Sequence, residues 1–198
     1  PDSRERRSTQ TALWEIAAVL ARLLAPIIPF TAEEVWGTLE LTDQPESVHL
    51  ASWPEPVPGR KDEELVARWE KLLELRKEAL KLLESSRRQG EIGNPLEARL
   101  KILVADSEWK EFLERYEKIL PLILIVSQTE LGEFSLSDQS PGGSSTEIGG
   151  IRLSVEPARG EKCARCWKYS PTIGEAAEAP DCCRECLKQM ENIQKNPA

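Results

Sequence analysis

All five cysteines of this 198-residue chain lie between residues 163 and 186. They include two C-x2-C pairs, Cys163 with Cys166 and Cys183 with Cys186, and sixteen residues separate the pairs. That separation is typical of a four-cysteine zinc site. Two cysteines three positions apart on a tight turn can direct both thiolates at one ion, and two such turns complete a tetrahedron. We therefore predict one structural zinc ion that replaces a hydrophobic core in this segment.

The fifth cysteine, Cys182, directly precedes the second pair and leaves the ligand set open. With Cys186 it would form the less usual C-x3-C pair, so the spacing favours Cys183 over Cys182. Unmetallated thiols or adventitious disulfides are the alternative to a metal site. Clustered cysteines in an odd number are not typical of a secreted disulfide framework, so we expect a reducing, cytoplasmic compartment. The single histidine, His49, is far from both pairs and is interpreted as a solvated loop side chain.

Helical periodicity dominates the first half of the chain. Apolar residues recur at spacings of three and four over residues 13–24 and 62–88, which predicts two amphipathic helices. Between them, Thr31 and Glu34 are spaced as a capping box that would begin a further helix. Gly90, Gly93 and the Asn94–Pro95 pair end the second periodic segment. We predict a helical domain over residues 1–93.

The pattern changes to strands after residue 93. Leu100, Ile102 and Val104 alternate with other side chains, and residues 151–155 do the same. The continuous apolar run 122–126 predicts a buried strand, and residues 137–150, rich in Ser, Gly and Asp, predict a loop. The predicted fold is mainly α: a helical bundle over residues 1–93, a small α+β domain over 94–158 and a four-cysteine zinc module over 159–198.

The charge is unevenly distributed. The net charge of −8 argues against binding nucleic acid through bulk charge, but residues 151–168 carry five basic and two acidic side chains. No apolar run reaches the roughly 18 residues needed to cross a membrane, so we predict no membrane partner. With one histidine and no phosphate-binding glycine loop, the sequence singles out no catalytic residue.

Two basic clusters are candidates for binding. An aromatic side chain flanked by cations on a rigid metal turn can stack a splayed base and hold phosphates. Cations at a helix start are not explained by the helix dipole, which favours them at a C-terminus. Trp167 could equally pack over the cysteine turn as its miniature core. The candidate residues are Arg4, Arg6 and Arg7 at the start of the first helix, and Arg165, Trp167 and Lys168 beside the first cysteine pair.

Several stretches resemble a known family. RRSTQTALWEIAAVLARLLAPIIPFTAEEVW resembles the anticodon-binding helical domain of class I aminoacyl-tRNA synthetases. SVHLASWPE, PLEARLKI and LILIVSQTEL resemble successive downstream blocks of bacterial isoleucyl-tRNA synthetases. KCARCWKYS followed by CREC resembles the C-terminal zinc-binding peptide of that family. The resemblance covers most of residues 4–187, and Cys182 departs from it.

The resemblance implies a tRNA-recognition portion of a larger enzyme. The family's catalytic signatures, of the HIGH and KMSKS types, do not occur here, so the chain itself is expected to be non-catalytic. The parent enzyme would join isoleucine to its tRNA using ATP. The implied partners are an isoleucine-accepting tRNA and the remaining synthetase domains, and we expect a monomer. The helical part would receive the anticodon stem-loop, with the two basic clusters on the RNA side.

Two other functions are alternatives to this interpretation. One is a zinc-stabilised protein-interaction module with no RNA role. The other is a zinc-finger DNA glycosylase of the formamidopyrimidine type, because the terminal cysteine turns resemble that family and the chain begins with Pro1. The residues that follow Pro1 do not resemble the opening of that family.

Overall fold

The computed structural model describes residues 3–134 and 145–195. The chain divides into two compact units, one of residues up to 62 together with the chain's end from 192, the other of residues 63–191. Each unit is described separately below. Among the described residues, no helix is both long and apolar enough to cross a membrane.

The first unit is a helical hairpin with an extended strap. Helix α1 (Arg4–Leu24) is followed by α2 (Pro29–Thr38) and a short 3-10 turn, η1 (Val48–Leu50). Trp36 lies at the centre of the small core, and its indole Nε1 donates to the Pro45 carbonyl at 2.9 Å. The Glu33 carboxylate accepts hydrogen bonds from the Ser47 hydroxyl and the Val48 N–H, which holds the strap against α2.

The start of α2 differs from the sequence prediction. The helix begins at Pro29, with Ile28 at the N-cap and no side-chain cap, so Thr31 and Glu34 lie inside it. Proline suits the first helical position because its missing N–H would have no intrahelical acceptor there, and its fixed φ is already helical. The predicted capping box at Thr31 is therefore wrong.

The second unit is built on a four-stranded sheet. The long helix α3 (Glu63–Arg88) leads through η2 (Pro95–Glu97) into β1 (Ala98–Val104), α4 (Ser107–Glu114), α5 (Leu120–Ile123) and β2 (Gln128–Glu133). A hairpin of β3 (Ser145–Ile148) and β4 (Ile151–Pro157) completes the sheet in the order β2-β1-β4-β3. Strands β1 and β2 are parallel, and the other pairings are antiparallel.

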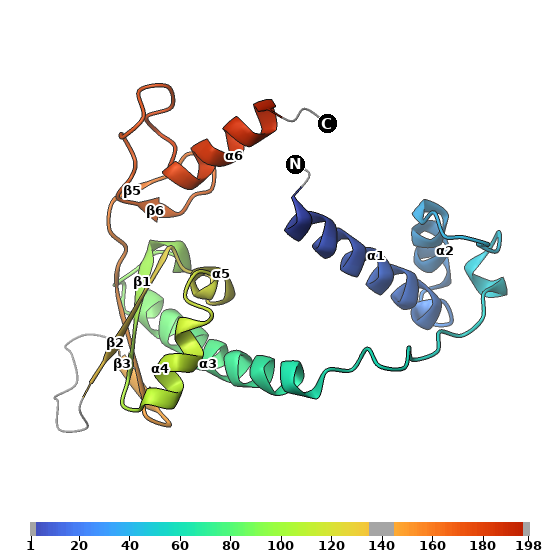
Figure 1. Ribbon diagram of the computed structural model, residues 1–198, viewed down its shortest axis with the longest axis horizontal. Helices are drawn as coiled ribbons and strands as arrows, with labels where there is room; N and C mark the ends of the chain where they lie inside the picture. The colour runs from blue at the N-terminus through green and yellow to red at the C-terminus, as the bar shows by residue number, and fades with distance from the viewer. Residues whose placement is uncertain (1–2, 135–144, 196–198) are drawn as a thin grey trace. The chain divides into compact units, whose positions relative to one another are not determined.

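Helices cover one face of this sheet, as Figure 1 shows for α3 and α4. Leu100, Ile102 and Val104 of β1 point into the core, which confirms the predicted alternation. They pack with buried leucines of α3 and with Leu113 of α4. On the opposite side of β1, Arg99 is nearly buried and pairs with carboxylates on β2 and β4. This ion-pair network ties β1 to both of its neighbouring strands.

Two loop and strand predictions need correction. The run 122–126 is not a strand: α5 ends at Ile123, and the strand β2 begins only at Gln128. Leu124 and Val126 are fully buried, but Leu122 and Ile125 are exposed, so the prediction of a buried run is correct for only part of it. β3 lies within the predicted loop 137–150, where Gly149 and Gly150 supply the positive φ angles of a tight hairpin turn. The loop positions 137–144 lie outside the described residues.

Helix α3 packs in the same core as the sheet. Its buried residues, Leu72 and Leu83 among them, belong to one cluster with β1 and β4. The spatial division of the chain falls before α3, between Asp62 and Glu63, whereas the sequence places the end of the helical domain at residue 93. The boundaries at residues 93 and 158 stay predictions about which segments fold alone.

The packing of α3 predicts different effects at two adjacent leucines. Leu72 is 0% exposed and Leu73 is 51% exposed. Leu72→Ala should lower the free energy of unfolding by about 2–5 kcal/mol, because it leaves a cavity in the sheet core. Leu73→Ala should change it by less than roughly 1 kcal/mol. Urea denaturation followed by circular dichroism measures both, and equal effects would contradict the assignment of α3 to this core.

Candidate metal centre and nucleic-acid interface

The C-terminal module is a small hairpin followed by a helix. Strand β5 (Glu161–Lys162) pairs with β6 (Tyr169–Ser170), and α6 (Arg184–Lys195) follows after a long loop. Gly160 enters the hairpin with φ +87°, and a Cβ at this position would lie 2.2 Å from the Ser170 backbone. The turn between β5 and β6 contains Cys163 and Cys166, and the second cysteine pair lies at the start of α6.

The four predicted ligands come together in space. The Sγ atoms of Cys163, Cys166, Cys183 and Cys186 all lie within 4.8 Å of one another. The Cys163–Cys186 and Cys166–Cys183 sulfur pairs are each separated by 3.8 Å. A tetrahedron with metal–sulfur bonds of about 2.3 Å has edges of about 3.8 Å, so the arrangement fits one tetrahedral ion. Disulfide bonds would need sulfurs about 2 Å apart.

Backbone amides lower the pKa of one of the four thiols, that of Cys163. Burial raises the pKa of the Cys163 thiol, but backbone hydrogen bonds from Cys166, Cys183 and Arg165 outweigh it and lower the pKa to about 6. The Cys183 N–H is 3.3 Å from this sulfur. Burial raises the pKa of Cys166 and also that of Cys186, to about 12, so both favour the thiol until a cation offsets the cost of charge. The site is thus suited to a metal that displaces these protons.

Cys182 is buried beside the cluster but outside it. It packs with the four cysteines, yet its sulfur is not among the group that could hold one ion. Burial, with Asp181 as a further contributor, raises the pKa of the Cys182 thiol. The geometry therefore favours Cys183 over Cys182, as the spacing rule did.

Trp167 has a backbone conformation that its residue type disfavours. Its φ is +65°, in the left-handed region, and its N–H donates to the Cys163 carbonyl at 2.9 Å. Glycine would adopt this conformation without strain, so the turn alone does not explain a tryptophan here. The side chain is 63% exposed, and the Lys162 ammonium lies 5.5 Å from the ring centroid. The alternative role of Trp167 as a miniature core is not the one that the structure shows.

The two predicted basic neighbours of Trp167 differ in their surroundings. Arg165 is exposed, and its Nη1 atom lies 3.5 Å from the Cys186 carbonyl. Lys168 is half-buried and lines a cavity of about 410 Å³ beside the cysteines. Its carbonyl accepts the Cys163 N–H at 2.9 Å, so the turn fixes its backbone.

The second basic cluster lies at the start of α1. Ser3 caps the helix by accepting the Arg6 N–H at 3.2 Å. Arg4, Arg6 and Arg7 lie in the first turns and are exposed. They belong to the first compact unit, so the structure does not place them with the residues around Trp167.

Sequence reasoning missed the residues that join the cysteine module to the sheet. Gln128, the first residue of β2, accepts the Arg159 N–H at 3.0 Å and donates to the Arg159 carbonyl at 2.8 Å. The neighbouring Ser127 hydroxyl accepts the Tyr169 N–H at 2.8 Å and donates to the Leu96 carbonyl at 2.5 Å. We call Ser127 and Gln128 the clamp. The only sequence signal for the clamp is that these two polar residues directly follow the apolar run 122–126.

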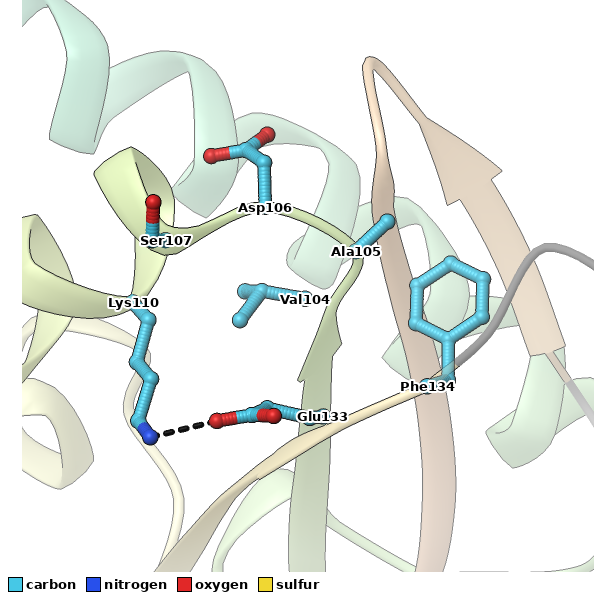
Figure 2. A pocket seen from close by; sticks show the side chains of 7 residues that line it. All are labelled: Val104, Ala105, Asp106, Ser107, Lys110, Glu133 and Phe134. Carbon is cyan, nitrogen blue, oxygen red and sulfur yellow. Dashed lines mark hydrogen bonds and ion pairs between the residues drawn. The ribbon is translucent and has the colours of Figure 1, made fainter.

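A different cavity, of about 430 Å³, lies where β1 leads into α4. Figure 2 shows Lys110 and Glu133 facing one another across it as an ion pair. Asp106 is also engaged, because its carboxylate accepts the Trp109 N–H at 2.8 Å and caps α4. The charged side chains of this cavity are thus engaged with other protein groups.

Family comparisons match both ends of the chain. Residues 1–102 match the anticodon-binding domain of tRNA ligase, and residues 160–189 match a zinc finger found in FPG and IleRS. The second match covers all five cysteines, Trp167 and both basic residues beside it.

Curated relatives match nearly the whole chain. The chain is 38% identical to an isoleucine–tRNA ligase of Moorella thermoacetica over 98% of its own length and 21% of the relative. It is 40% identical to the isoleucine–tRNA ligase of Geobacter sulfurreducens over 96% of its length, and 39% identical to that of Thermotoga petrophila over 98%, each match covering 20% of the relative. The chain therefore spans about a fifth of the length of these relatives.

The ligand geometry predicts different metal contents for two adjacent substitutions. Wild-type protein should contain one zinc per chain, and Cys182→Ser should keep it. Cys183→Ser should lose most of the metal, because three thiolates leave the tetrahedron incomplete. Elemental analysis of purified protein measures the content, and the cobalt-substituted form reports tetrahedral thiolate coordination by its absorption. Metal loss in Cys182→Ser with retention in Cys183→Ser would reverse the assignment.

Proposed function

Because the chain belongs to the family of anticodon-binding domains of tRNA ligases, we propose that it is the tRNA-recognition portion of an isoleucyl-tRNA synthetase. Its proposed partners are an isoleucine-accepting tRNA and the remaining domains of the synthetase. That enzyme would join isoleucine to the tRNA using ATP, a reaction for which this chain supplies binding surface. The proposal rests on the family match and on the aromatic, cationic turn over the cysteine site.

The exposure of Trp167 is the observation that best supports RNA binding by the C-terminal module. An exposed indole on a strained turn offers a flat face on which an unpaired base can stack. Lys162 near the ring and the exposed Arg165 supply cations for the adjoining phosphates. A monomeric state and the first-helix cluster Arg4, Arg6 and Arg7 as RNA contacts are further parts of the proposal.

Zinc fits the site as a structural ion. Cys163, Cys166, Cys183 and Cys186 would hold it, and four thiolates leave no position for a reacting water. Bound zinc supplies cohesion to a module whose other apolar residues are only partly buried. The residues of the turn then hold Trp167 in its left-handed conformation through the Trp167 N–H and the Cys163 carbonyl.

The proposal predicts that removing the indole weakens tRNA binding. Trp167→Ala should raise the dissociation constant for isoleucine-accepting tRNA by roughly five- to a hundredfold, since stacking contributes about 1–3 kcal/mol per base. Arg165→Ala should also weaken binding. Arg184→Ala is the matched control on the same module, because Arg184 is paired with Glu175 at 2.6 Å. Filter binding or fluorescence titration measures all four proteins.

Two results would count against this assignment. Equal binding by wild type, Trp167→Ala and Arg165→Ala would remove the turn from the RNA surface. Absence of tRNA binding by the wild-type chain, with zinc bound and the fold intact, would contradict the proposed function itself.

The first-helix cluster predicts a change in salt dependence. Each phosphate contact contributes to the slope of log affinity against log salt, by roughly 0.7–0.9 per contact. Arg4→Ala combined with Arg6→Ala should therefore reduce that slope by about one to two. Arg60→Ala is the control in the same unit, because Arg60 pairs with Glu15 at 2.6 Å. An unchanged slope in the double variant would exclude these arginines from the interface.

A further inference from the structure

A cavity of about 410 Å³ lies between helix α5 and the cysteine module. Its volume falls within the range of small-ligand pockets, roughly 300–1,000 Å³. Pro121 and Leu122 of α5 form one side, and Lys168 and Tyr169 of the module form another. The clamp residues Ser127 and Gln128 also line it. Because the clamp joins the sheet to the module by hydrogen bonds, the two sides of the cavity are held together within the second unit.

Two of its lining side chains are exposed. Leu122 is 70% exposed although it belongs to the short helix α5. Lys118, one turn earlier, is exposed and also lines the cavity. In the described parts of the chain, neither Lys118 nor Lys168 has an ion pair, whereas Arg99, Lys101 and Lys110 of the same unit all do. The cavity thus combines an open apolar surface with two lysines, and its lining also includes one carboxylate, that of Glu185.

We propose that this cavity binds one unpaired nucleotide of the RNA, separate from the base that stacks on Trp167. The inference rests on the proposed function, and it adds a second position for a splayed base. A nucleotide suits the lining, because its base has two apolar faces and a polar edge while its phosphate is anionic. The apolar face meets Pro121 and Leu122, and the phosphates lie at Lys118 and Lys168.

The cysteines determine which end of the nucleotide enters. Cys166, Cys183 and Cys186 also line the cavity. A cysteine sulfur that binds a metal has no proton to donate to a phosphate but can accept a hydrogen bond from an N–H group of a base, so the base faces the cysteines and the phosphates lie at Lys118 and Lys168. Lys168 directly follows Trp167, so the same turn presents an exposed base position at Trp167 and a cation in the cavity lining at Lys168. Successive nucleotides of one strand can therefore occupy the two positions.

The experiment uses the full zinc-loaded chain and isoleucine-accepting tRNA. Leu122→Trp fills the cavity from an exposed position, so the fold and the zinc content should be unchanged, as circular dichroism and elemental analysis would report. We expect a tenfold or greater rise in the dissociation constant for this variant, on the scale of one lost base contact, and a smaller rise for Lys118→Ala. Lys188→Ala is the control, because Lys188 is exposed on α6 and does not line the cavity.

Photocrosslinking supplies an independent measurement. The tRNA carries 4-thiouridine in its anticodon loop, and mass spectrometry identifies the crosslinked peptides. Crosslinks to residues 118–128 in the wild type, lost in Leu122→Trp, would support the pocket. If Leu122→Trp binds like wild type while Trp167→Ala binds weakly, the pocket is overturned and the proposed function stands. If the wild-type chain binds no tRNA, both are overturned.

Discussion

Four cysteine sulfurs within 4.8 Å of one another cannot all be thiolates unless a cation lies among them. This constraint governs the C-terminal module, whose apolar residues other than cysteine are only partly buried. The first turn holds Trp167 in a left-handed conformation, and the second lies at the start of α6. The Cys163 carbonyl accepts the Trp167 N–H and the Cys163 N–H donates to the Lys168 carbonyl, so Cys163 fixes the backbone of both residues.

The sheet provides the other half of the arrangement. Buried leucines of α3 and alternating residues of β1 form one core, and the parallel pairing of β1 with β2 places Ser127 and Gln128 at the sheet's edge toward the module. The connection between sheet and module consists of directional hydrogen bonds from these two side chains. A rigid core thus positions a metal-stabilised module, which in turn positions the proposed RNA contacts.

The sequence predicted what depends on spacing and periodicity. Paired C-x2-C turns at a fixed separation indicated the four clustered sulfurs, and alternation indicated β1 and β4. The predictions from sequence were wrong where another local structure suited the same residues. The run 122–126 is apolar enough for a strand, but it begins within the helical turn α5, in which Leu122 is exposed, and Leu124 at the C-cap is buried. Thr31 has the side chain of a helix cap, yet Pro29 begins the helix. The clamp depends on contacts between residues thirty or more positions apart, which no local pattern encodes.

The clamp binds backbone atoms of its partners. Gln128 pairs with the N–H and carbonyl of Arg159, and Ser127 accepts the N–H of Tyr169. Side chains at positions 159 and 169 are therefore free to change without loss of these bonds. The attachment therefore does not depend on which side chains the module carries at these two positions. Substitutions there, or replacement by another hairpin of the same backbone shape, would leave the bonding groups of the sheet unaltered.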